Sequence, residues 1–363
     1  MLKFIHAADF HLDSAFGALD SRRAALRRAE LRETVVRLSD YVNKHDIRLV
    51  LLAGDLFDSG SVYAETGEQL AAALGRMEAK VFISPGNHDW YGPGSPWETV
   101  EWPENVHIFK ENRLTAAEAE GVVIHGAAFT GTEQTEGVLT GFAVPEDGKV
   151  HIGLLHGEID PPEERYGPIR REEIAASGLS YLALGHTHKR MEPRRFDRTL
   201  CAWPGCMEGR GFDELGEKGF YEGTIEENGE VSLAFVPFAW RRYERIEVDV
   251  TGQDPRRAVE AALPEDTARH LYRVILTGET GEGGVDADGL REALDHRFYA
   301  LEIRDRTRMA EDIWRRAEED SLRGLFLRQL REQWNKAETE EERERVTKAV
   351  RFGLAALDHR DLG

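Results

Sequence analysis

The sequence predicts an α/β protein that combines a two-sheet sandwich, a small α/β unit and a C-terminal helical hairpin. Over the first 240 residues, short aliphatic runs alternate with helical stretches, which is typical of layered α/β domains. The alternation resumes on a smaller scale over residues 243–304, and from about residue 309 apolar residues recur at spacings of three and four, which favours helices. The expected domains are residues 1–240, 241–305 and 306–363.

The large domain begins with a strand–helix–strand pattern. Its first strands are expected at residues 3–9, 48–55 and 80–84, with helices at 22–45 and 63–77 between them. Later apolar runs have fewer helices between them, so we expect a second, more antiparallel sheet packed on the first. These runs are residues 122–129, 150–156, 181–185, 220–225 and 231–236.

The small unit and the tail follow the same reasoning. Strands and helices of the small unit alternate, with a glycine-rich loop inside it at residues 278–284. The expected elements are strands at 243–250, 271–277 and 298–304 and helices at 256–263 and 289–296. In the tail, Thr339 with Glu342 three residues later is a capping-box pattern, which predicts the start of the second helix of a hairpin.

Composition excludes several classes of protein. The net charge of −20 argues against a general electrostatic attraction to nucleic acid, so divalent cations would have to hold any polyanionic substrate locally. The tail carries thirteen basic and thirteen acidic residues and is not a basic arm. Two cysteines, Cys201 and Cys206, cannot form a disulfide framework or a four-thiolate zinc site. With no signal sequence and no membrane-length apolar run, we expect a cytoplasmic protein without a membrane role.

Five predicted strands end in residue types that bind metal ions. The blocks are Asp9 with His11, Gly54 with Asp55 and Asp58, Gly86 with Asn87, His88 and Asp89, His156 with Gly157, and Gly185 with His186 and His188. Asp9 and His11 are two residues apart, so in extended backbone both side chains would lean to one side. Strand ends of open α/β sheets converge on a crevice, so the blocks are expected to share one site. Each block alone is a weak signal, and Asp9 with His11 alone would be better explained as a capping aspartate beside a surface histidine.

On these blocks the chain resembles the calcineurin-like metallophosphoesterases over roughly residues 1–240. The stretches 8–14 and 54–58 are similar to those of SbcD-like DNA repair nucleases, in particular the YhaO-type branch, and so are residues 166–168 and 204–219. The resemblance implies one ion held by Asp9, His11 and His188, a second held by Asn87, His156 and His186, and Asp55 bridging both. It favours Mn²⁺, and the mixed imidazole, carboxylate and amide donors suit such a borderline ion. Iron is the alternative.

The resemblance also implies roles for residues beside the ligands. Two ions about 3.5–4 Å apart would activate a shared water, orient the phosphate for in-line attack and neutralise its charge. His88 is not needed as a ligand, so it is expected to contact the scissile phosphate and protonate the leaving oxygen, with Asp58 orienting it. Helix capping is the alternative for Asp58. Asp13 and Asp89 are expected to accept hydrogen bonds from metal-binding histidines.

The resulting expectation is a metal-dependent DNA nuclease of DNA repair, with 3′-to-5′ exonuclease and single-strand endonuclease activities. The alternatives are a small-molecule phosphodiesterase or phosphatase on the same fold, and a non-catalytic scaffold. The resemblance further implies that the middle unit is a capping domain shaping access of DNA, and that the C-terminal helices bind the coiled coil of an SbcC-like ATPase; it is compatible with a homodimer. Docking of those helices on the main body is the other explanation of their apolar stripes.

Overall fold

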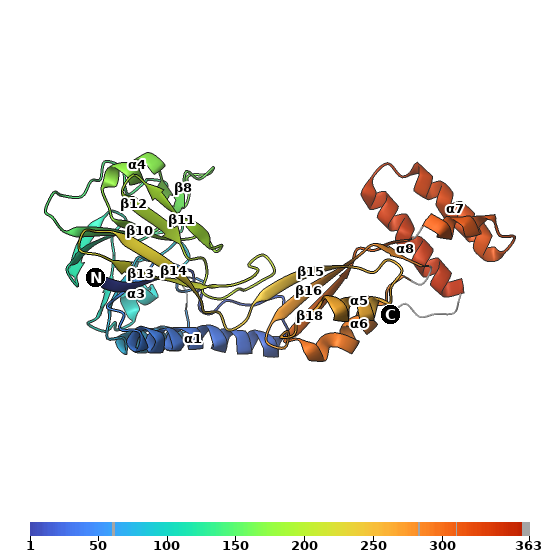
Figure 1. The fold of residues 1–363 in the computed structure, drawn as a ribbon, viewed down its shortest axis with the longest axis horizontal. Coiled ribbons are helices and arrows are strands. Elements are labelled where there is room, and N and C mark those ends of the chain that lie inside the picture. The colour runs from blue at the N-terminus through green and yellow to red at the C-terminus, as the bar shows by residue number, and fades with distance from the viewer. Residues whose placement is uncertain (60–61, 282–283, 310, 358–363) are drawn as a thin grey trace. The chain divides into compact units, whose positions relative to one another are not determined.

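The computed structural model describes residues 1–59, 62–281, 284–309 and 311–357. The chain divides into two compact units, Met1–Arg242 and Tyr243–Gly363. Unit 1 contains two six-stranded sheets, which confirms the predicted α/β sandwich (Figure 1). Among the residues that the structure describes, no helix has the length and apolar character needed to cross a membrane.

The first sheet of unit 1 has the strand order β14-β13-β1-β2-β3-β4. Its parallel part consists of β1 (Leu2–Ala7), β2 (Leu49–Leu52), β3 (Lys80–Ile83) and β4 (Val106–Ile108). Helices α1 (Ser21–Lys44) and α2 (Ala64–Gly75) make the first two crossovers. On the other side of β1, strands β13 (Gly219–Ile225) and β14 (Val231–Pro237) are antiparallel. The prediction that residues 220–225 and 231–236 belong to the second sheet is therefore wrong.

The second sheet has the order β11-β12-β10-β7-β6-β5. Its central pairs are parallel, and only the edge strands β11 and β5 run antiparallel to their neighbours, so this sheet is not the more antiparallel one. Its strands are β5 (Thr115–Ala119), β6 (Val122–Gly126), β7 (Val150–His156), β10 (Tyr181–Gly185), β11 (Met191–Phe196) and β12 (Thr199–Trp203). Short elements complete the unit: α3 (Pro96–Thr99), β8 (Glu158–Ile159), β9 (Pro168–Ile169) and α4 (Arg171–Ser177).

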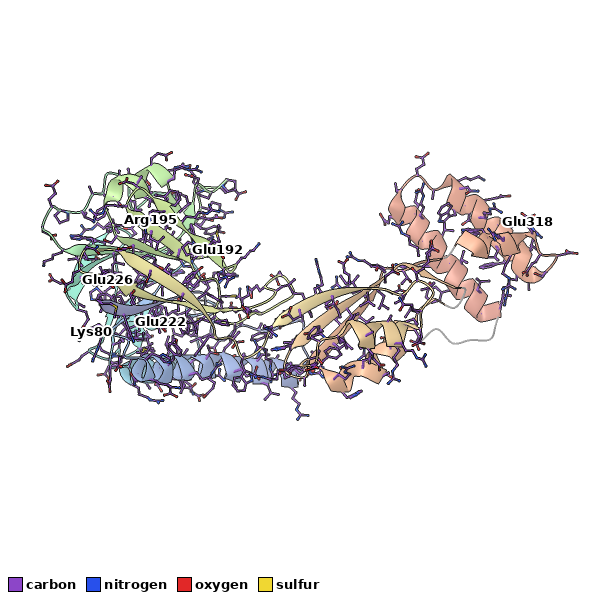
Figure 2. The ribbon with its side chains drawn as sticks, in the orientation of Figure 1. Lys80, Glu192, Arg195, Glu222, Glu226 and Glu318 are labelled. Carbon is purple, nitrogen blue, oxygen red and sulfur yellow. The ribbon has the colours of Figure 1, made fainter. Side chains whose placement is uncertain are left out.

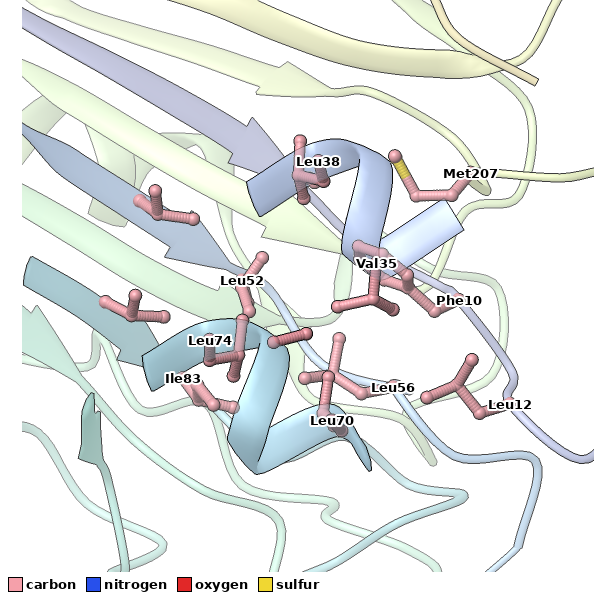
Figure 3. Packing of buried hydrophobic residues seen from close by; sticks show 14 of the residues in the cluster. Phe10, Leu12, Val35, Leu38, Leu52, Leu56, Leu70, Leu74, Ile83 and Met207 are labelled. Atoms are coloured by element: carbon pink, nitrogen blue, oxygen red, sulfur yellow. The ribbon is translucent and has the colours of Figure 1, made fainter. Parts of the chain in front are cut away.

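Two hydrophobic layers bury both faces of the first sheet. Along β2, Leu49 and Leu51 point into the core between the sheets, while Val50 and Leu52 point into the core under α1 and α2 (Figure 3). This alternation explains why the strand is an unbroken apolar run. Helix α1 packs one apolar stripe into the core that it shares with α2 and the first sheet; Figure 3 shows Val35 and Leu38 of this stripe.

Unit 2 begins with a parallel sheet of order β15-β16-β18, formed by Tyr243–Asp249, Leu271–Thr277 and Ala300–Asp305. In the chain, these strands are connected by helices α5 (Pro255–Ala262) and α6 (Ala287–Leu294) and a 3-10 turn, Asp295–Arg297. Leu276, Val259 and Leu290 contribute to its core. Part of the expected 278–284 loop, Glu279–Thr280 (β17), pairs with Arg308–Met309 (β19). Positions 282 and 283 of that loop lie outside the described residues.

The C-terminal part of unit 2 is helical. A 3-10 helix, Glu311–Glu318, precedes α7 (Leu322–Lys336) and α8 (Glu340–Leu357). Helical structure from about residue 309 is confirmed, with the first helical residue at Glu311; Met309 itself belongs to a strand, and Ser321 caps α7 as a separate helix. The capping box is confirmed: Thr339 Oγ1 accepts from the Glu342 N–H at 3.2 Å, and Glu342 accepts from the Thr339 N–H at 3.3 Å.

Candidate metal centre

The five polar blocks meet at one edge of the sandwich because glycines let their strand ends approach closely. Gly54 adopts φ +85°, and a side chain there would collide with the ring of His156. A side chain at Gly185 would collide with the main chain of Ala53. These two glycines thus bring β2 of the first sheet against β7 and β10 of the second.

Asp9 and His11 do not lie in extended backbone, contrary to the prediction. Strand β1 ends at Ala7, and both residues are in the left-handed region, with φ of 52° and 47°. Their main-chain N–H groups donate to the carbonyls of Gly54 and Asp55, each at 3.0 Å. Asp55 itself has φ 52°. Strained backbone of this kind persists only where surrounding contacts determine it, and it gathers at functional sites.

A first group of ligand atoms comes from Asp9, His11, Asp55 and His188, and all lie within 4.8 Å of one another. The Nε2 atoms of His11 and His188 are 3.0 Å apart. Two nitrogens bound to one ion at about 2.1 Å would be separated by roughly this distance. Asp9 Oδ2 is buried and has no hydrogen-bond partner among the residues that the structure describes, while its Oδ1 accepts from the His186 N–H at 3.1 Å. An orphaned carboxylate oxygen among imidazoles fits a bound cation.

A second group adjoins the first through Asp55. His156 Nε2 lies 3.3 Å from Asp55 Oδ2 and 3.1 Å from Asn87 Oδ1. His186 Nδ1 lies 3.2 Å from the same Asn87 oxygen. The structure therefore brings all seven predicted ligand side chains together, and Asp55 stands between the two groups.

Electrostatics in this centre couple Asp55 to His156. Burial acts to raise the pKa of Asp55, but the charge and hydrogen bond of His156, together with His11, hold the pKa well below its usual range. Burial acts to lower the pKa of His156, and the Asp55 charge outweighs it, raising the pKa to about 9. Burial is also the main cause that raises the pKa of Asp9. Without a cation, a proton on His156 balances the negative charge of Asp55. A divalent cation bound between the same groups would take the place of that proton.

Comparison with known proteins agrees with this geometry. The model of the calcineurin-like phosphoesterase family matches residues 2–190, more than half of the chain. The chain belongs to this family. It is 29% identical to the uncharacterized metallophosphoesterase YhaO of Bacillus subtilis (strain 168), over 98% of this chain and 99% of that protein. It is also 23% identical to the DNA double-strand break repair protein Mre11 of Methanopyrus kandleri, over 86% of this chain and 72% of that protein.

His88, the expected proton donor, lies beside His11, with the two ring centres 4.9 Å apart. It is exposed, and its main-chain N–H donates to Asp55 Oδ1 at 2.9 Å. Its Nδ1 donates to the main-chain carbonyl of Asp58 at 2.9 Å, because a carbonyl can only accept. This hydrogen bond engages Nδ1, and not Nε2, of the exposed ring.

Asp58 orients His88 through its backbone and not through its carboxylate, which corrects the prediction. The carboxylate Oδ1 lies 3.1 Å from His11 Nδ1 and accepts from Arg210 Nη1 at 2.9 Å. The capping alternative also fails, because α2 begins at Ala64 with Tyr63 as its N-cap residue.

Among the described residues, neither Asp13 nor Asp89 accepts a hydrogen bond from an imidazole, so their expected role is wrong. Asp13 accepts from Arg32 at 3.1 Å and from Thr66 at 3.0 Å, which ties the first loop to α1 and α2. Asp89 accepts the main-chain N–H groups of Gly86 and Leu56, both at 2.7 Å, and of Phe57 at 3.2 Å. It therefore fastens the Asp55 loop to the Asn87 loop.

The structure adds two residues that sequence reasoning did not name. Glu214 Oε1 accepts from His188 Nδ1 at 2.8 Å, and Arg210 contacts Glu214 and Asp58. Burial acts to raise the pKa of Glu214, but hydrogen bonds from His188 and Arg210 hold the pKa well below its usual range. Only the resemblance over residues 204–219 pointed to this segment.

Several basic residues follow His188 in the chain, and their surroundings differ. Lys189 and Arg194 are exposed, whereas Arg190 stacks over Phe235 with its guanidinium carbon 4.2 Å from the ring centre. Figure 2 shows Arg195 and Glu192 on the same strand, β11. The strand thus presents both signs of charge and no purely basic stripe.

Proposed function

We propose that this phosphoesterase is a DNA nuclease of DNA repair, with 3′-to-5′ exonuclease and single-strand endonuclease activities. The main support is the extent of the similarity to the Mre11 protein, which covers 86% of the chain. Unit 1 accounts for 242 of 363 residues, about two thirds. The similarity therefore continues beyond the phosphoesterase domain, into a unit that a small phosphate ester does not require.

The proposed ligands form two cation positions, and Asp55 contributes to both. Asp9, His11 and His188 form one position, and Asn87, His156 and His186 form the other. Divalent ions, for which we propose Mn²⁺, would activate water and neutralise charge on the phosphate. His88 donates a proton from Nε2 to the departing oxygen, since its Nδ1–H is held by the Asp58 carbonyl.

Local contacts would have to hold DNA, since the chain carries a net charge of −20. Lys189 and Arg194 are exposed cations that closely follow His188 in the chain. They are our candidates for phosphate contacts that position a strand without reading its bases.

The C-terminal helices are our proposed contact with an SbcC-like coiled-coil ATPase. Leu322, Leu325 and Phe352 expose 70%, 51% and 61% of their surface on α7 and α8. Apolar side chains exposed to this extent on a helical pair suit an amphipathic helical partner. We would test the contact by co-purifying the chain with the candidate ATPase, comparing the wild type with Leu325→Asp.

The decisive experiment compares DNA with a small ester under one set of conditions. Purified protein with Mn²⁺ is incubated with 3′-end-accessible duplex DNA, labelled single-stranded DNA and a chromogenic phosphodiester, with His88→Gln as the inactive control. Cleavage of both DNAs at catalytic enzyme concentrations is expected. Hydrolysis of the chromogenic ester without any DNA cleavage would instead favour a small-molecule phosphodiesterase.

A further inference from the structure

Arg210 binds two carboxylates, and each carboxylate lies beside a histidine of the proposed metal centre. The Arg210 side chain is 20% exposed. Nη1 donates to Asp58 Oδ1 at 2.9 Å, and Nη2 donates to Glu214 Oε1 at 2.8 Å. The Arg210 main-chain N–H donates to the second Glu214 oxygen at 2.8 Å. One arginine thus holds two carboxylates at once.

Each of these carboxylate oxygens also faces a proposed ligand. Asp58 Oδ1 lies 3.1 Å from His11 Nδ1, and Glu214 Oε1 lies 2.8 Å from His188 Nδ1. The Nε2 atoms of the two rings face each other at 3.0 Å. The hydrogen bond to Glu214 fixes the direction of the His188 ring and keeps the proton on Nδ1, which leaves Nε2 free to bind a cation. Asp58 lies at ion-pair distance from His11 Nδ1 without the geometry of a hydrogen bond, so it acts on that ring through its charge.

The other cation position has no such support. His156 Nδ1 donates to the Ala53 carbonyl at 2.8 Å. His186 Nδ1 faces Asn87 Oδ1, itself a proposed ligand, at 3.2 Å. Neither of these two contacts involves an arginine or a carboxylate. Arg210 therefore acts on one side of the centre.

The segment that carries Arg210 is itself anchored in the core. Arg27 of α1 is fully buried, and its Nη2 donates to Glu208 Oε2 and to the Gly209 carbonyl, both at 3.1 Å. Thr34, further along the same helix, donates to the other Glu208 oxygen at 3.3 Å. The residues directly before Arg210 are thus fixed to α1, which gives the guanidinium a defined position.

We propose that Arg210 is a positioning residue that selectively sets the cation affinity of the position formed by Asp9, His11 and His188, an inference that rests on the metal centre of the proposed function. Arg210 does not serve substrate directly, because its donors are engaged. Nη1 also reaches Ser14 Oγ, and Nε reaches Glu214 Oε2, both at 3.4 Å, so all three guanidinium nitrogens donate to protein oxygens. Nη2 also lies 3.0 Å from His188 Nδ1, but this nitrogen carries the proton donated to Glu214 and does not accept a second one.

The direction in which cation affinity changes when Arg210 is replaced distinguishes a positioning role from an effect of its charge alone. A guanidinium acting only through its charge repels a cation, so its removal would tighten cation binding. A guanidinium that holds Asp58 and Glu214 in place has the opposite effect, because its removal frees both imidazoles to turn. Loss of such supporting contacts weakens metal affinity by roughly 10–100-fold.

The test measures Mn²⁺ binding directly, by equilibrium titration with detection of free Mn²⁺ by electron paramagnetic resonance. Arg210→Gln is combined with His186→Ala, so that the remaining ion reports the first position, and separately with His11→Ala, so that it reports the second. We expect a loss of roughly 10–100-fold in the His186→Ala background and less than about threefold in the His11→Ala background. Arg76→Gln, which removes an exposed pair with Asp40, is the matched control.

A second variant keeps the test decisive if Arg210→Gln does not fold. Arg210→Lys keeps the charge but supplies a single point donor that cannot span two carboxylates, so a loss near tenfold is expected. Unchanged or tighter binding in the His186→Ala background, or an equal loss in both backgrounds, would overturn the role of Arg210. Failure of the wild type to bind Mn²⁺ would instead remove the metal centre, and the proposed function with it.

Discussion

The Nε2 atoms of His11 and His188 lie 3.0 Å apart, although 177 positions separate these residues in the chain. Their Nδ1 atoms lie beside Asp58 and Glu214, so each ring has a carboxylate on one side and faces the other ring on the opposite side. Asp9 Oδ2, which is buried and without a hydrogen-bond partner in the described part of the chain, belongs to the same group. This arrangement leads to the following predictions.

Asp55→Asn is expected to abolish binding of both ions, because Asp55 is the carboxylate that lies between the two ligand groups. The loss should exceed the roughly 10–100-fold that removal of a supporting contact costs. Metal content after dialysis against Mn²⁺, measured by inductively coupled plasma mass spectrometry, checks this. Asp40→Asn, at an exposed pair, serves as the control. Two ions retained by Asp55→Asn would contradict a bridging role.

His88→Gln is expected to keep the metal content and to lower kcat by about 10²–10⁴-fold, the usual effect of losing a general acid. The exposed ring of His88 donates to the Asp58 carbonyl, and the Asp55 carboxylate accepts from the His88 main chain, so the ligand groups do not depend on the ring. Single-turnover DNA cleavage and metal analysis on the same sample check both parts. Retained turnover would overturn the role of His88.

Mn²⁺ affinity is expected to rise with pH up to about 9. His156 has its pKa raised to about 9 by Asp55, so below that pH a cation must displace a proton from the ring. Affinity should increase by up to about tenfold per pH unit between pH 6.5 and 9 and then level off. Calorimetric titrations in buffers of different ionisation enthalpy measure the released proton. A flat affinity over this range would be inconsistent with a protonated His156.

The stability of the fold is expected to fall in mild acid. Burial lowers the pKa of His6 to about 3 against the opposing hydrogen bond to Leu184, and burial together with His151 lowers the pKa of His125 to about 4. The unfolded chain takes up these protons near pH 6.5, so the free energy of unfolding is highest above pH 6.5 and decreases as the pH falls toward 4. Urea unfolding at constant metal concentration measures this decrease. His125→Gln should flatten it, whereas His296→Gln, at a position that is not buried, should not.

Glu208→Gln is expected to lower the free energy of unfolding by about 3 kcal/mol, near the lower end of the cost of breaking a buried ion pair. Arg27 and Glu208 are both fully buried, and Arg27 keeps Glu30 at 2.6 Å as a second partner. Chemical denaturation gives the value. Arg76→Gln, at an exposed pair, should cost less than about 1 kcal/mol. Equal costs for the two variants would show that burial does not strengthen the Arg27 pair.

Local patterns were sufficient to predict much of this molecule. The apolar runs at residues 150–156 and 181–185 coincide with β7 and β10, and the Thr339 capping box forms as expected. These features depend on neighbours a few positions away in the chain. The seven proposed ligand side chains were implied by the family resemblance of the strand-end blocks, and the structure brings these side chains together.

Other features depended on contacts between distant segments. Periodicity along residues 220–225 does not encode that β13 pairs with β1, since an antiparallel partner on either sheet would require the same apolar pattern. Strands β4, β5, β11 and β12 were likewise not anticipated. The direction of the Asp58 carboxylate, toward His11 and Arg210, follows from where residues 204–219 return to the site.

The sequence by itself therefore determined the residue types of the candidate metal centre and the order of the main elements. These features depend on residues that are close together in the chain, namely the spacing of apolar residues and the polar residues that follow each strand. Only the tertiary structure decided which sheet takes the strands at 219–237, how Asp9 and His11 turn into left-handed backbone, and that Arg210 and Glu214 stand behind two histidines. Those outcomes arise from long-range pairing and buried charge, whose partners lie far away in the chain.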